Sequence, residues 1–141
     1  MQFCSILIEK PMTTITSQAI ARYRDQLAHS VEAMQALDTI EDCEGNLEDA
    51  ALTLGIQVGQ QPDRNDWLEG LAKRCRVAIC EGDFPGALKD NNISAVVSHL
   101  SDRKVCHPLL APLVVAYVLE QGIDDFCAPI HFKLNYDGEN N

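Results

Sequence analysis

The chain has 141 residues, enough for one domain with a sizeable core, and its 46% hydrophobic share argues against wholesale disorder. Its 21 acidic against 11 basic side chains give a formal net charge of −10 at pH 7. Binding to phosphate backbones depends on Lys and Arg, and here they gather only in short groups such as residues 73–76. We therefore expect no nucleic-acid partner.

The first residues, MQFCSILIEKPM, lack the basic start and the long apolar stretch of a signal peptide. The longest apolar run, residues 109–119, is about half of what a bilayer requires. These features predict a cytoplasmic protein without a membrane partner, whose six cysteines are reduced. Met1 and Met12 are both possible starts, so residues 1–11 are expected to be an extension or an edge strand.

Residues 17–40 show the first helical pattern. Apolar residues recur there at spacings of three and four, which places them on one stripe: Ile20, Tyr23, Leu27, Val31, Met34 and Leu37. Thr16 or Ser17 can cap the start of this helix, and Gly45 follows its end. Because a helix of this length would reach beyond a small domain, part of its stripe is expected to meet a second chain.

Shorter helices follow. Asn46 begins one of them and forms, with Asp49, an imperfect capping box. A further helical pattern covers residues 65–80, a single turn is expected after Asp83, and Asn92 precedes another amphipathic stretch.

Residues 108–121 form the most apolar helical pattern of the chain, with almost no polar face. Pro108 suits the first helical position, where a missing N–H costs nothing. A helix that is apolar all round belongs in the centre of a domain or in an interface. The sequence therefore predicts a mostly α, single-domain bundle of five to six helices around residues 108–121.

The tail PIHFKLNY changes period, since Ile130, Phe132, Leu134 and Tyr136 alternate with polar residues. A lone strand is not stable, and the other strand-like segment is FCSILIE near the start. We therefore predict a short β-ribbon from the N- and C-terminal segments. The helical domain would span residues 12–136, including the C-terminal strand, and residues 137–141 would be a flexible tail.

Cys106 and His107 are the candidate catalytic residues. They precede the helix that starts at Pro108, with Arg103 and Lys104 nearby. A helix N-terminus and neighbouring cations lower a thiol pKa, as in reactive cysteines. This placement suggests a thiol-dependent enzyme or redox sensor. The alternative interpretation is that Cys106 is a small apolar residue packed under the helix.

A Cys/His metal site is a further possibility, because thiolates and imidazoles bind zinc and iron–sulfur clusters. The residues concerned are Cys75, Cys80, Cys106, His107, Cys127 and His131. Their spacing is loose: no CxxC occurs, and Cys75 and Cys80 would lie about 140° apart on one helix. We therefore predict no metal and no cofactor.

The function predicted from these patterns is that of a small acidic cytosolic protein-binding module with a regulatory or assembly role. It would act through helical and strand-edge surfaces on a protein partner, possibly a second copy of itself in a homodimer. The alternatives are the thiol-dependent enzyme using Cys106 and His107 and the Cys/His metal-binding protein. No motif decides whether the chain is an enzyme.

Overall fold

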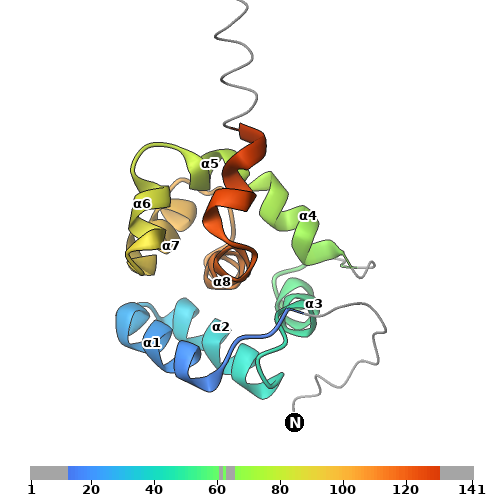
Figure 1. The fold of residues 1–141 in the computed structure, drawn as a ribbon. Helices are drawn as coiled ribbons and strands as arrows, with labels where there is room; N and C mark the ends of the chain where they lie inside the picture. Colours follow the sequence, from blue (N-terminus) through green and yellow to red (C-terminus); the bar gives the residue numbers. More distant parts are fainter. Residues whose placement is uncertain (1–12, 61, 63–65, 131–141) are drawn as a thin grey trace, which may run out of the picture.

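The computed structural model describes residues 13–60, 62 and 66–130, and these are mostly helical (Figure 1). The helices are α1 (Ser17–Leu27), α2 (Val31–Asp42), α3 (Leu47–Gln57), α4 (Trp67–Arg74), α5 (Arg76–Cys80), α6 (Phe84–Lys89), α7 (Ile93–Asp102) and α8 (Ala111–Gln121). Residues 123–130 are also helical. The predicted mostly α class is confirmed. The described residues hold more than the predicted five to six helices, partly because two predicted helices are each broken in two.

Helix α8 lies at the centre of the fold, with the other helices around it (Figure 1). Residues 111–118 are all buried, and α8 packs against α2, α3, α4 and α7. Complete burial of each Leu or Val side chain contributes about 1.5–3 kcal/mol, so α8 is a main source of stability. In the part of the chain that the structure describes, no helix is long and apolar enough to span a membrane.

The predicted single helix over residues 17–40 is wrong, because the chain turns between α1 and α2. Ser30 is extended, with φ −114° and ψ 118°, and its Oγ accepts a 3.1 Å hydrogen bond from the N–H of Ala33. Serine in this position favours a helix start over continuation. The two helices pack against each other, so Ile20 and Leu37 are buried within the chain. The long stripe that suggested a second chain therefore does not exist.

The predicted helix over residues 65–80 is also interrupted, at Cys75 between α4 and α5. The Cys75 N–H bonds to the carbonyls of Leu71 and Ala72, at 3.2 and 3.0 Å. After this break Cys80 forms a disulfide with Cys127, with a Cα–Cα distance of 5.7 Å. Cys43 is disulfide-bonded too. The expectation that all cysteines are reduced is therefore wrong.

The predicted β-ribbon, the extension at 1–11 and the tail at 137–141 lie outside the described residues, except Ile130. At Ile130 the strand prediction is wrong, because residues 123–130 are helical. Ile123, Phe126, Cys127 and Ile130 fit the spacing i, i+3, i+4, i+7, and the first three are buried. In residues 13–60, 62 and 66–130 the β contact is one isolated antiparallel bridge between Thr14 and Asn46.

The capping box at the start of α3 is half formed. Asn46 Oδ1 accepts a 3.0 Å hydrogen bond from the N–H of Asp49. The Asp49 side chain is buried, and its Oδ1 has no hydrogen-bond partner among the described residues. Burial, and then the neighbouring charge of Glu48, raise the pKa of Asp49. The ionised carboxylate therefore destabilises the folded state.

We expect Asp49→Asn to raise the free energy of unfolding by about 1 kcal/mol at pH 7, because the amide removes a poorly solvated charge. The folded-state pKa is raised above the unfolded value, so the cost is present above the folded pKa and disappears as the pH falls through it. The gain should therefore shrink in urea titrations taken from pH 7 towards pH 4. Asp25→Asn, at an exposed position on α1, is the control. A gain independent of pH would contradict this account.

Candidate functional site

Cys106 is buried beneath the turn that precedes α8, with 6% of its surface exposed. Cys75, at the junction of α4 and α5, is buried in the same hydrophobic core. A hydrogen bond with Cys75, then burial and the charge of Cys75, raise the pKa of Cys106 against a smaller lowering by Arg74. The environment that favours a reactive thiolate is therefore not found at Cys106.

His107 is exposed, and its Nδ1 accepts a 3.0 Å hydrogen bond from the N–H of Leu109. The ring therefore supports the turn before α8, and this ring nitrogen is not free to act as a base towards Cys106. These positions give the hypothesis of a thiol-dependent enzyme no support.

The cysteines and histidines considered for a metal site do not gather in one place. Cys80 and Cys127 are bonded to each other, and Cys75 and Cys106 are buried free thiols. Among the described residues there is no group of three or more His, Cys, Asp or Glu side chains that could hold a metal ion. His131 lies outside those residues, so the Cys/His metal site likewise has no support.

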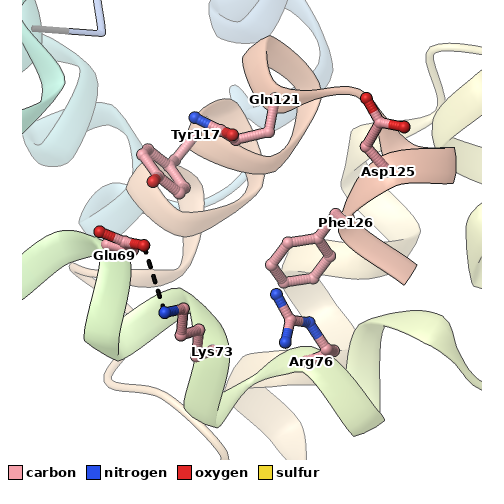
Figure 2. A pocket seen from close by; sticks show the side chains of 7 residues that line it. All are labelled: Glu69, Lys73, Arg76, Tyr117, Gln121, Asp125 and Phe126. Carbon is pink, nitrogen blue, oxygen red and sulfur yellow. Dashed lines mark ion pairs between the residues drawn. The ribbon is translucent and has the colours of Figure 1, made fainter. Parts of the chain in front are cut away.

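A polar pocket lies elsewhere, where α4 and α5 face α8 and the helix of residues 123–130 (Figure 2). Its cavity has a volume of about 110 Å³. The lining residues are Glu69, Lys73, Arg76, Tyr117, Gln121, Asp125 and Phe126. The pocket thus brings cations, carboxylates, a phenol and an amide to one place beside the C-terminal part of α8.

Arg76 is the cation of this pocket that lacks a carboxylate partner. Lys73 pairs with Glu69 at 3.2 Å, whereas no ion pair within the described ranges involves Arg76. The Arg76 guanidinium carbon lies 4.8 Å from the centre of the Phe126 ring, on which the side chain stacks (Figure 2). Its Nε is buried and has no hydrogen-bond acceptor in the described part of the chain. A guanidinium has five N–H donors, and in this one the Nε–H at least has no acceptor among the described residues.

The disulfide holds the two walls that carry Arg76 and Phe126. Cys80 lies one helical turn after Arg76, and Cys127 directly follows Phe126. The cross-link therefore holds α5, which carries Arg76, against the helix of residues 123–130, which carries Phe126. Such restraint reduces the conformational entropy that these segments lose when a partner binds.

Tyr117 supplies a further donor from α8. Burial, and then the charges of Glu69 and Glu48, raise the pKa of Tyr117. Its hydroxyl therefore remains protonated at neutral pH. Tyr117 and Arg76 lie on different walls of the cavity, so an acceptor inside it can meet donors from two sides (Figure 2).

Sequence reasoning missed this pocket. The signal for Arg76 was the basic run at residues 73–76, which was weighed only as a nucleic-acid contact. Nothing in the sequence indicated that Phe126 and Tyr117 line a pocket, because an aromatic residue at helical spacing is interpreted as part of the hydrophobic core.

We expect iodoacetamide to alkylate free Cys106 in the native protein at pH 8 at least about tenfold more slowly than in guanidinium. The thiolate is the reactive form, and each unit by which the pKa rises lowers its population tenfold. Mass spectrometry of proteolytic peptides over time gives both rates in samples where Cys106 is a free thiol. Rapid alkylation of native Cys106 would restore the thiol-enzyme hypothesis.

No family model matches the chain, and no curated protein or solved structure is significantly similar to it. The function is therefore inferred from the geometry of the pocket around Arg76.

Proposed function

We propose that this protein is a protein-binding module that receives an acidic side chain of its partner in the pocket at Arg76. The observation that carries the proposal is Arg76, a half-buried residue whose Nε lacks an acceptor among the described residues. Arginine binds carboxylates through two parallel hydrogen bonds, which give both energy and orientation. Stacking on Phe126 keeps the guanidinium plane fixed for such a contact.

The size of the pocket favours one side chain over a whole metabolite. Its cavity of about 110 Å³ is well below the roughly 300–1,000 Å³ of small-molecule sites. It can take a carboxylate and the carbon atoms next to it. A glutamate or aspartate projecting from a protein surface presents such a group, and the rest of that surface would lie on the rim.

Charge sets a condition on the partner. The net charge of −10 repels acidic molecules at long range. At about 0.1 M salt this repulsion is screened beyond roughly 10 Å, so the charges close to the pocket determine whether it can bind an anion. Locally, Glu69 is paired with Lys73, and Asp125 is exposed. Arg76 is thus the group that favours an anion, and we infer a partner with an isolated acidic residue rather than an acidic tract.

The partner is either another protein or a second copy of this chain. The α1–α2 hairpin buries its stripe internally, so the earlier reason for a homodimer is lost, and the strand-edge surface lies outside the described residues. The two disulfide-bonded sites, at Cys43 and at Cys80–Cys127, favour an oxidising compartment over the predicted cytoplasm.

We expect a library of random peptides displayed on phage to yield binders enriched in one glutamate or aspartate position. Replacing that residue by its amide should weaken binding about tenfold or more, because a charge-assisted hydrogen bond is lost. Arg76→Lys should do the same, since lysine lacks the planar pair of donors. Arg22→Lys, at an exposed position on α1, is the control and should have no effect. Binders without an acidic preference, or unaffected by Arg76→Lys, would contradict the proposal.

The guanidinium can also be followed directly by NMR. On titration with a selected peptide, the Arg76 Nε–H resonance should shift in a saturable manner. Arg24, already paired with Asp38 and Glu41, is an internal reference and should not move. Equal, unsaturable shifts at both arginines would show that the peptide does not bind at the pocket.

A further inference from the structure

Helix α4 lies at the edge of the bundle (Figure 1), and two hollows of the surface flank it. Glu69 and Lys73 line the first of them, the pocket at Arg76. The second has a volume of about 250 Å³, and its lining residues are Asp66, Trp67, Gly70, Leu71 and Arg74. At about 100° per residue, the two sets of α4 side chains point in directions roughly 130° apart around the helix axis. The hollows therefore lie on the two flanks of one exposed strip of α4, which includes Gly70.

The second hollow has an apolar floor. Leu71 is buried, with 7% of its surface exposed, and the half-buried Trp67 also lines the hollow. The Trp67 ring packs closely on α3, since a Cβ added to Gly55 would come within 2.8 Å of its Cη2 atom. The fold thus holds the indole in place while part of it stays accessible. The volume of this hollow, about 250 Å³, is below the roughly 300–1,000 Å³ of small-molecule sites and suits one large apolar side chain.

Gly70 is a residue that the fold itself does not require. It lies inside α4, is exposed and has no positive φ. A Cβ added to it would meet no described atom within 4 Å. Glycine is nevertheless the least favourable residue after proline in a helix interior. The missing side chain keeps the strip between the hollows flat, and this allows the backbone of another molecule to approach α4 closely.

We propose that the strip of α4 and its two hollows form one docking surface for a partner segment that carries an acidic residue and a large apolar residue. The acidic side chain enters the pocket at Arg76. The backbone of the segment crosses α4 at Gly70, and the apolar side chain fills the hollow against Trp67 and Leu71. This inference rests on the proposed function and adds the second anchor and the path between the two.

The charges of this surface specify the partner further. Arg74 lines the second hollow and, like Arg76, has no ion pair within residues 13–60, 62 and 66–130. Tryptophan and arginine are the side chains that most often dominate protein interfaces, and the docking surface combines one tryptophan with two such arginines. Two arginines without a carboxylate are complementary to acidic residues on either side of the partner's apolar one. A second copy of this chain is disfavoured, because two chains of net charge −10 repel each other.

Trp67 is the only tryptophan of the chain, so its fluorescence reports directly on the second hollow. The probe is the tightest tryptophan-free peptide from the phage selection described above, titrated into the full chain. We expect a saturable blue shift of the emission, because an apolar side chain displaces water from the ring. The shift should give the same Kd as the NMR titration of the Arg76 Nε–H. Emission that stays unchanged at saturating peptide would overturn the inference.

Gly70→Gln places a side chain on the strip between the hollows, where the fold leaves open space. We expect it to weaken peptide binding about tenfold or more, because a close backbone contact does not tolerate the added atoms. Gly86→Gln is the matched control, since Gly86 is an exposed glycine of α6 with equally open surroundings among the described residues. It should leave binding unchanged. Both variants should keep or raise the Tm, because glutamine favours a helix over glycine.

The outcomes distinguish this inference from the proposed function. If Arg76→Lys weakens binding and Gly70→Gln does not, the pocket binds an acid but the docking surface does not extend across α4, and only the inference is overturned. If Arg76→Lys has no effect, both proposals fail. The selected peptides should also share a large apolar residue at a fixed spacing from the acidic one, and its replacement by alanine should weaken binding about tenfold or more. Acid-dependent binders without such an apolar position would overturn the inference alone.

Discussion

The burial of α8 on all sides is the constraint on which the rest of the structure depends. Because residues 111–118 have no exposed face, α2, α3, α4 and α7 must all pack on them. This arrangement places α4 beside α8, and α5 directly follows α4. The wall that carries Lys73 and Arg76 is thereby set opposite Tyr117. The apolar side chains of α8 require neighbouring helices along almost its whole length. Near its last turn the side chains become polar, and there the neighbouring helices form the walls of the described pocket.

The pocket combines a fixed cation with walls that a disulfide restrains. Arg76 stacks on Phe126, and the Cys80–Cys127 bond connects their two helices. A flexible surface arginine would lose entropy on binding a carboxylate, whereas this one is already positioned. The alternative centred on Cys106 has the opposite character, because the thiol is buried and its pKa is raised by a hydrogen bond with Cys75 and by burial. Cys106 therefore has a role in the packing of the fold rather than in a reaction with a substrate.

The sequence predicted the mostly α class and the central apolar helix, because both follow from hydrophobic period alone. It failed where a local signal competes with that period. Ser30 ends one helical pattern by capping the next helix, and Ile130 fits the last turn of a helix as well as the first residue of a strand. The pocket could not be predicted, since Arg76 and Phe126 meet through a tertiary contact that no spacing along the chain reveals. The disulfide between Cys80 and Cys127 could not be predicted for the same reason.

Native-state hydrogen exchange tests the central position of α8 most directly. If α8 is enclosed by its neighbours, the amides of Val114 to Val118 should exchange only through global unfolding, with a free energy of opening equal to that of denaturant unfolding. The amides of the short helix α6 should exchange through smaller openings. Exchange of the α8 amides at rates like those of α6 would show that the helix has a face open to water. The packing that sets the walls of the pocket would then be wrong.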